Sequence, residues 1–182
     1  IETDAGGALV RLAGSAASAI SRGAAPDTRR GAIDIEAGAV LKASGAMALD
    51  ATRSTRSLGR LEPAPGASVA LAAGSISLGD ASAANVTGNA TGNVTGNAGT
   101  GLALSNAQLA SFNQLAVLEL KSYTRIDLLG SAQVGSTTLK KLTLDTPLLQ
   151  GVAVATGAGA GGPAAARITA AEVVLKNTVG AL

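Results

Sequence analysis

The side chains with the clearest chemical potential in this sequence are carboxylates carried on short apolar segments. Two carboxylates from neighbouring strands can act as the acid and the base or nucleophile of a glycosidase, and carboxylates beside Lys121 and Arg125 could line the charged groove of a polysaccharide lyase. In an alternating strand these acids occupy the polar phase, so we expect most of them to point outward to water. A solvated strand face with scattered charges is the interpretation we favour. The acids are Asp34, Glu36, Asp50, Glu119, Asp127, Asp145 and Glu172.

The chain contains neither cysteine nor histidine. Disulfides, zinc sites built from Cys and His, thiol nucleophiles and Ser-His-Asp arrangements are therefore all excluded. A chain without cysteine also suits passage through an oxidising periplasm in an unfolded state, since no thiols can mispair. We predict a non-enzymatic protein with no catalytic, cofactor-binding or metal-ligating residues and no cofactor.

A glycine motif lies near the C-terminal end of the sequence. Gly157, Gly159 and Gly162 match G-x-G-x-x-G directly after an apolar segment. A dinucleotide site also needs a helix N-terminus aimed at the pyrophosphate and an acidic residue about 20 residues on, where this chain has an asparagine. We interpret residues 156–166 as a Gly/Ala-rich loop.

An Asn-x-Thr-Gly tetrad occurs in tandem, beginning at Asn85, Asn89 and Asn93. Each copy spells the N-glycosylation acceptor, but the repeat period generates that motif by itself. The segment lacks charge and is rich in turn-forming residues. We predict that residues 81–100 form an unmodified, exposed, low-complexity loop.

Arginines gather in the first third of the chain. They could form a weak docking patch for anionic glycans or lipid headgroups, although a solvated loop is the simpler interpretation. The formal charge of +2, from 14 basic and 12 acidic side chains, is too even to indicate a nucleic-acid partner. Aromatic platforms for single-stranded nucleic acid are missing as well. The arginines are Arg22, Arg29, Arg30, Arg53, Arg56 and Arg60.

The elements that would carry these side chains are short apolar alternations ended by Gly, Ser, Asn or Asp. Each predicts a strand of about five residues with one buried face. Two or three such strands in a coil give a period of roughly 20 to 25 residues, which is typical of a solenoid. The predicted strands are Ile33–Gly38, Met47–Thr52, Val69–Leu71, Ile76–Leu78, Leu102–Leu104, Val117–Leu120, Ile126–Leu128, Leu142–Leu144, Val152–Val154 and Glu172–Leu175.

The apolar residues favour a narrow interior. Hydrophobic residues make up 47% of the chain, yet Phe112 and Tyr123 are the only aromatics. Small aliphatic side chains fill a thin core better than a thick one anchored by rings. An antiparallel sandwich is the main rival, but the Asn-Gly or Asp-Gly dipeptides expected at its hairpins do not occur.

Helix signals are few. Ser105–Leu115 has a serine suited to an N-cap and apolar residues spaced along one helical face, and Pro163–Val174 is a second candidate. No uninterrupted apolar run reaches the roughly 18 residues of a membrane helix. No signal peptide opens the sequence, so we expect an export signal upstream of it.

The stretch Leu118–Gly130, followed by Leu142–Asp145, resembles the filamentous haemagglutinin family of two-partner secreted exoproteins. Rod segments of that family carry a leucine-rich strand, a Ser-Tyr turn, an Ile-Asp strand and a Leu-Thr-Leu-Asp strand. Ile168–Thr178 is similar to the next element of this pattern. The first hundred residues resemble the family only in the general style of their short apolar strands. The resemblance carries over no catalytic or metal-binding residue.

What the resemblance implies is an all-β, right-handed parallel β-helix in which residues 1–182 form a single segment of a longer rod. It also implies secretion to the bacterial cell surface through an outer-membrane partner. The role would be adhesion to a host or neighbouring-cell receptor or glycan, or display of an effector. Flanking coils of the same rod would be further partners, and we expect the end strands to be uncapped. A glycan-cleaving β-helix enzyme remains the alternative function.

Inside such a coil the sequence assigns roles to individual residues. Leu118, Leu120, Ile126 and Leu128 should point inward and stack on like residues one coil away, at the ~4.8 Å spacing of strands in a sheet. The polar residues Ser122, Thr124 and Asn177 should lie at corners and satisfy backbone groups in turns.

Overall fold

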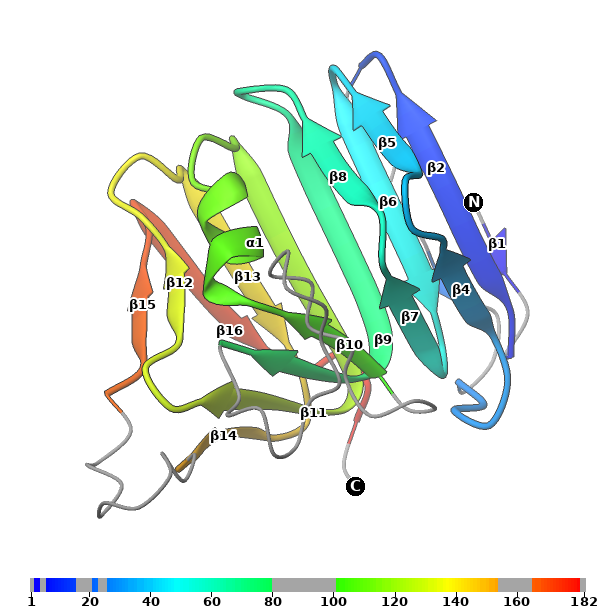
Figure 1. Ribbon diagram of the computed structural model, residues 1–182. Helices are drawn as coiled ribbons and strands as arrows, with labels where there is room; N and C mark the ends of the chain where they lie inside the picture. Colours follow the sequence, from blue (N-terminus) through cyan, green and yellow to red (C-terminus); the bar gives the residue numbers. More distant parts are fainter. Residues whose placement is uncertain are drawn as a thin grey trace.

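The computed structural model describes residues 2–3, 6–15, 21–22, 26–79, 101–153 and 165–180. Over these ranges the protein is mostly parallel β-sheet with one short helix (Figure 1). The predicted loop 81–100 falls wholly outside the described residues, and so does nearly all of the predicted loop 156–166. No helix in the described part of the chain is both long and apolar enough to cross a membrane.

The elements follow one another with short connections. In chain order they are β1 (Glu2–Thr3), β2 (Ala8–Ala13), β3 (Ser21–Arg22), β4 (Ala32–Ile35), β5 (Val40–Ala43), β6 (Ala46–Ala51), β7 (Ser54–Ser57), β8 (Arg60–Pro63), β9 (Ser68–Leu78), β10 (Gly101–Leu104), α1 (Asn106–Ser111), β11 (Val117–Leu129), β12 (Gln133–Gly135), β13 (Lys141–Asp145), β14 (Leu149–Val152), β15 (Arg167–Thr169) and β16 (Glu172–Lys176).

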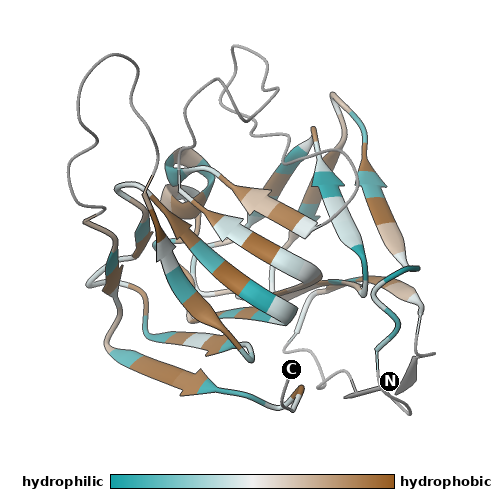
Figure 2. Ribbon diagram, turned by 90° about the horizontal axis from the view of Figure 1, so that it is seen from below, coloured by the Kyte–Doolittle hydropathy of each residue, from teal (hydrophilic) through white to brown (hydrophobic). Residues whose placement is uncertain are grey.

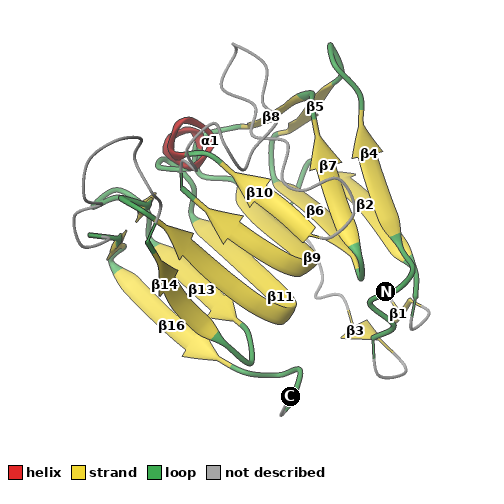
Figure 3. Cartoon of the chain, turned by 60° about the horizontal axis from the view of Figure 1, so that its bottom comes forward, coloured by secondary structure: helices red, strands yellow, loops and turns green. Residues whose placement is uncertain are grey.

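Two long strands organise the main sheet. The first part of β9 pairs with β6 on one side and with the first part of β11 on the other, and β11 continues the sheet to β13 and β16. The second part of β9 pairs with β10 and with the second part of β11, which also pairs with β14. The two parts of β11 are separated by a register shift between Ser122 and Arg125. Figure 3 shows β9, β11, β13 and β16 as successive neighbours.

The order of strands departs from the order of the chain at β10. This strand lies between β7 and the second part of β9, although it follows both in the sequence. Three smaller parallel pairs, β1 with β3, β5 with β8 and β12 with β15, complete the arrangement together with α1. Figure 1 shows α1 between β8 and β12.

The core consists of apolar columns that run across successive strands. Because parallel strands pair in register, residues at equal positions lie one above another about 4.8 Å apart. The predicted inward positions of Leu118, Leu120, Ile126 and Leu128 are confirmed, since all four are buried. The first column contains Met47, Val69, Leu118, Leu142 and Val173, and the second contains Leu49, Leu71, Leu120, Leu144 and Leu175.

Every predicted strand overlaps an observed one, but their limits differ. The segments at Val69 and Ile76 belong to the single strand β9, and those at Val117 and Ile126 to β11. The strand predicted from Val152 ends at that residue in β14. Strands β1, β2, β3, β5, β7, β8, β12 and β15 were not predicted.

The first predicted helix, Ser105–Leu115, is confirmed over Asn106–Ser111, and the second is wrong. Ser105 caps α1 through a capping box in which its hydroxyl accepts from the Gln108 amide. Over its described residues, 165–174, the predicted helix Pro163–Val174 is instead strand β15 and the start of β16. Parallel pairing with β12 and β13 overrides the weak helical pattern, because the β-branched residues Ile168, Val173 and Val174 suit a sheet.

The expectation of open end strands is wrong for β6. Strand β2 lies along it as the one antiparallel pair in the described ranges, with Val10 opposite Leu49 and Leu12 opposite Met47. At the other end of the columns, β16 pairs only with β13 among the described residues.

We expect truncation inside a column to destabilise the fold strongly. Leu120 has no exposed surface and lies between Leu71 and Leu144. Leu120→Ala should therefore lower the free energy of unfolding by about 2 to 5 kcal/mol, as measured by chemical denaturation. The matched change Leu148→Ala, at a side chain that is 38% exposed, should cost clearly less. Equal losses for the two variants would contradict the column as the core.

Candidate functional site

Charged side chains gather on the outer side of β11, β13 and β16, opposite the apolar columns. Along these strands hydrophilic and hydrophobic residues alternate, so the two sides of the sheet differ in polarity (Figure 2). We call this surface the charged face. It consists of Glu119, Lys121, Lys141, Asp145, Glu172 and Lys176.

Opposite charges on the charged face pair across strands. The Lys176 Nζ lies 3.0 Å from Glu119 Oε1, and the Lys141 Nζ lies 2.8 Å from Glu172 Oε1. The hydrogen bond to Glu119 holds the pKa of Lys176 above its usual value, despite the opposing effect of burial. Each pair joins two strands that are distant in the sequence. The attraction between the opposite charges favours the register in which these strands lie in the sheet.

Asp145 is the buried member of the charged face, with a side chain only 1% exposed. Its carboxylate accepts hydrogen bonds from the Thr178 amide at 2.8 Å and from the Thr178 hydroxyl at 2.6 Å. Lys121 and Lys176 approach it at 3.6 and 3.8 Å. Burial acts to raise the pKa of Asp145, but the two hydrogen bonds and the two ammonium groups outweigh it and hold the pKa below the usual value.

The register shift in β11 forms a corner that is closed by hydroxyl groups. Ser122 Oγ accepts from the Arg125 amide at 2.9 Å and from the Thr124 amide at 3.3 Å. Thr124 Oγ1 donates to the Gly74 carbonyl at 2.7 Å. At the end of β16, Asn177 Oδ1 accepts from two following amides. The predicted corner roles of Ser122, Thr124 and Asn177 are confirmed.

Tyr123 extends from this corner over the outer face. Its hydroxyl donates to Asp50 Oδ1 at 2.8 Å, which links β11 to β6 across β9. The Lys121 Nζ lies 5.8 Å from the centre of the tyrosine ring, within the range of a cation–π contact. The tyrosine therefore shields the carboxylate of Asp50 while satisfying it.

A second group of charges lies on β4, β7 and the second part of β11. Arg56 Nε lies 2.8 Å from Asp34, 22 residues away in the sequence, and the same guanidinium reaches Glu36 at 3.4 Å. Asp127 accepts from Arg125 at 2.9 Å and from the Gln150 amide group at 2.7 Å. The contacts of Asp34 with Arg56 and of Asp127 with Gln150 join neighbouring parallel strands, whereas the contact between Arg125 and Asp127 lies within β11.

The prediction that the acidic side chains point to water is confirmed for some and wrong for others. Glu119, Glu172, Asp34 and Glu36 are substantially exposed. In contrast, the carboxylates at positions 50, 127 and 145 are buried. They lie on outward positions, but neighbouring side chains cover them and supply hydrogen-bond donors, as for Asp145 beneath Lys121 and Lys176.

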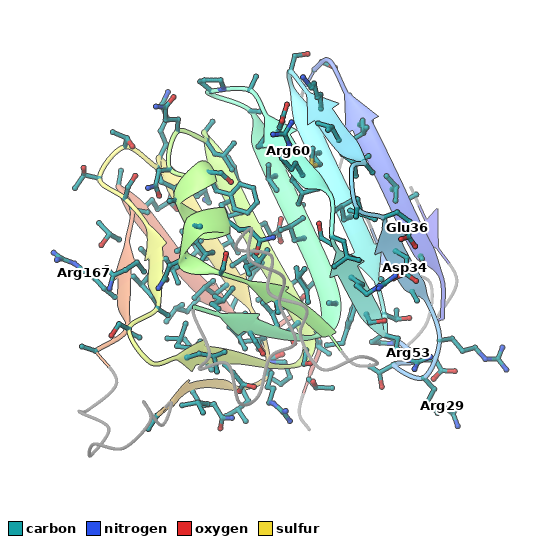
Figure 4. The ribbon with its side chains drawn as sticks, in the orientation of Figure 1. Arg29, Asp34, Glu36, Arg53, Arg60 and Arg167 are labelled. Carbon is teal, nitrogen blue, oxygen red and sulfur yellow. The ribbon has the colours of Figure 1, made fainter. Side chains whose placement is uncertain are left out.

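The arginines of the first third do not form one patch. Arg29 binds Asp27, and Arg60 binds Glu62 at 3.1 Å. Figure 4 shows Arg60 well separated from Arg29 and Arg53, and Asp34 beside Glu36. The side chain of the sixth arginine, Arg22, lies outside the described residues.

Each described Asp and Glu side chain from Asp27 to Glu172 has an ion-pair or hydrogen-bond partner. The described residues contain no group of three or more acidic side chains placed to hold a metal ion. The glycine motif at Gly157 and the acceptor asparagines Asn85, Asn89 and Asn93 lie outside the described residues. The interactions that the described charged groups make are ion pairs and hydrogen bonds, most of them across strands.

Two contributors to the charged surfaces were missed by sequence reasoning. Thr178 follows β16 and binds Asp145, and Tyr123 binds Asp50 across 73 residues. A hydroxyl residue just after a strand is a weak signal for such a contact, because it also suits any turn. The link between Tyr123 and Asp50 had no signal in the sequence.

Comparison of this chain with protein-family models, with curated proteins and with solved structures finds no match.

We expect the stabilising effect of Asp145 to depend on pH. Its pKa is lower in the folded state than in the unfolded chain, so its contribution is present above about pH 4 and is lost as the pH falls through the folded-state value. Asp145→Asn should therefore lower stability at neutral pH, and its difference from wild type should shrink in acid. Denaturant unfolding at several pH values measures this difference.

The control for this measurement is Asp34→Asn, which removes an exposed carboxylate from a pair with Arg56. An exposed ion pair contributes only about 0 to 1 kcal/mol, so this variant should stay close to wild type. A constant deficit of Asp145→Asn at every pH would contradict the electrostatic role of the carboxylate.

Proposed function

We propose that this chain is a non-enzymatic, structural and adhesive segment of a large secreted bacterial surface protein of the filamentous haemagglutinin type. In this proposal the strands wind as a right-handed parallel β-helix, and the segment belongs to a longer rod with flanking coils. The rod holds adhesive surfaces, or an effector, away from the cell.

The observation that carries the proposal is the pair of in-register apolar columns. Each column crosses the parallel strands β6, β9, β11, β13 and β16 with an aliphatic side chain at every level. Stacking of like residues at successive levels is how a solenoid builds a core that extends along one axis. A compact globular core would not need this repetition.

The succession of pairings supports a coiled path. Strands β4, β5 and β6 pair respectively with β7, β8 and the first part of β9, which are the next three segments of the chain. Each group of three makes one coil in the proposal. The 22-residue separation of Asp34 and Arg56 on adjacent strands fits a coil of roughly 20 to 25 residues. In a later coil α1 takes the place of a strand.

The state of the carboxylates favours a structural role over the alternative of a glycan-cleaving enzyme. A glycosidase needs two carboxylates that are free to act as acid and as base or nucleophile. Here Asp34 and Glu36 share one guanidinium, Glu172 binds Lys141 of the neighbouring strand β13, and Glu119 binds Lys176 two strands away. Such pairs serve to keep strands in register.

The family resemblance in Leu118–Gly130 and Leu142–Asp145 supports the biological part of the proposal. It implies secretion through an outer-membrane partner to the cell surface, and contact with a host or neighbouring-cell receptor or glycan. The proposed function involves neither a nucleic-acid partner nor a cofactor.

The proposed coil can be tested by a distance in solution. Asp34 and Gln150 lie at the two ends of one row, which passes through Arg56, Ala103, Ser77 and Asp127. Five strand spacings give a backbone separation of about 24 Å. Because the chain has no cysteine, Asp34→Cys with Gln150→Cys accepts two spin labels at defined sites. A narrow electron-paramagnetic-resonance distance near this value is expected, and a much longer or very broad one would contradict the stack.

The adhesive role is tested by display on a surface. Beads coated with the 182-residue chain should bind to cells or immobilised glycans, since many weak contacts add up when they are multivalent. The bound polysaccharide should release neither new reducing ends nor unsaturated uronate products. Product release would favour the enzyme, and failure of the beads to bind any cell or glycan surface would contradict adhesion by this segment.

A further inference from the structure

The outer edge of β16 is the point where the apolar columns meet solvent. Val173 and Leu175 continue the two columns but are 43% and 63% exposed, whereas Leu142 and Leu144, one strand inward, are buried. No strand in the described part of the chain pairs with this edge. An exposed apolar edge strand is a template for pairing with another chain.

We propose that two copies of this chain associate through β16, in an antiparallel pair whose two-fold axis passes beside Val174. The inference concerns the 182-residue chain by itself and does not rest on the proposed adhesive function; in the longer rod proposed above, a following coil would take the place of the second copy at this edge. In the isolated chain, the strand that pairs with this edge is thus β16 of a second copy.

The backbone of β16 has the groups that this pairing needs. The Glu172 amide donates to the Lys140 carbonyl, and the Lys176 carbonyl accepts from the Thr146 amide. In a parallel pair the N–H and C=O of one residue point to the same side, and successive residues alternate. Positions 172, 174 and 176 therefore face β13, while the amides and carbonyls of Val173 and Leu175 face outward.

The side chains of β16 are complementary to themselves in the antiparallel direction. With Val174 opposite Val174 of the second copy, Glu172 lies opposite Lys176 of the second copy, and the same pair recurs across the axis. Val173 then lies opposite Leu175 of the second copy, so the apolar columns of the two molecules join. Opposite charges placed directly across two strands stabilise the pair, whereas like charges destabilise it.

The charges select this register among its neighbours. The outward-facing amides and carbonyls alternate along β16, so another register keeps these hydrogen bonds only if it is shifted from this one by two residues or a multiple of two. A slide of two residues in either direction places Val174 opposite Glu172 or Lys176 and removes both charge pairs. The hydrogen bonds and the charges thus agree on a single arrangement.

Association should depend on protein concentration and on Leu175. Sedimentation of the full chain should show a monomer–dimer equilibrium between about 1 µM and 1 mM, the range of small interfaces. Leu175→Lys should weaken it by at least about tenfold, because it buries a charge at the centre of the contact. Val40→Lys, at an exposed valine on β5, is the matched control and should leave the dimer intact.

A head-to-tail contact between β16 and β2 is the competing arrangement. Val10 and Leu12 are exposed at the far ends of the same columns. Val10→Lys should leave the two-fold dimer unchanged. Equal weakening by Val10→Lys and Leu175→Lys, or growth beyond a dimer, would overturn the proposal.

A backbone variant separates loss of pairing from loss of folding. Val173→Pro removes an amide that faces the open edge, so it breaks no bond to β13. It should abolish the dimer while circular dichroism remains that of wild type.

The register is tested with a single cysteine. In an antiparallel pair the two copies of Val174 form a non-hydrogen-bonded pair, whose Cα separation suits a disulfide. Val174→Cys should therefore form a covalent dimer on mild oxidation, and Val40→Cys should not. A chain that stays monomeric over the whole concentration range, or a Val174→Cys variant that does not cross-link faster than Val40→Cys, would overturn the proposal.

Discussion

Parallel strands that hydrogen-bond in register place every residue directly above a residue at the same position of its neighbour. At a spacing of about 4.8 Å, a side chain is packed mainly by the levels above and below it. Each level of the columns must therefore offer an aliphatic group of similar size, as Leu49, Leu71, Leu120 and Leu144 do. This constraint explains how a chain with almost no aromatic residues forms a continuous core, since the columns need repetition rather than bulk. It also explains why the buried Phe112 lies at the C-cap of α1, where a helix replaces the regular stack.

The same constraint has the opposite effect on charges, because like charges at successive levels repel each other. A column of like apolar groups is stable, but a column of like charges would bring them within about 5 Å of one another. Neighbouring strands consequently carry opposite charges, as in Lys141 with Glu172 and in Lys121 with Asp145. Where a carboxylate is buried, as Asp145 is, it takes hydrogen bonds from the backbone and from a hydroxyl as well as two lysines. The charged face is thus a consequence of stacking, and its net charge stays small.

Strands with regular apolar alternation, such as those at Leu118 and Leu142, could be predicted from the sequence, as could the capped helix at Ser105. Strand β7 could not, because Ser54-Thr55-Arg56-Ser57 has no apolar alternation and is a strand only through its partners β4 and β10. The same reason accounts for the wrong helix at 165–174, where a local pattern competes with pairing to β12 and β13. For the carboxylates on the outer side of the sheet, the outward positions were predictable from the two-residue period, but the burial of Asp50 and Asp145 was not. It depends on Tyr123 and Thr178, whose contacts span 73 and 33 residues.

The place of β10 has a consequence for the order in which the sheet can assemble. Among the described strands, the second part of β9 pairs with β10 and β11, both of which are later in the sequence. During synthesis from the N-terminus, β7 and β9 are made before β10. They cannot pair with each other on this side of the sheet, because β10 lies between them in the folded protein. The backbone groups of Ser75–Leu78 on this side must therefore stay hydrogen-bonded to water until Gly101–Leu104 has been synthesised and pairs with them. Non-local pairings of this kind slow folding, because the loop must close before the contact forms. On this side of the sheet the position between β7 and β9 therefore stays empty until β10 pairs with both strands.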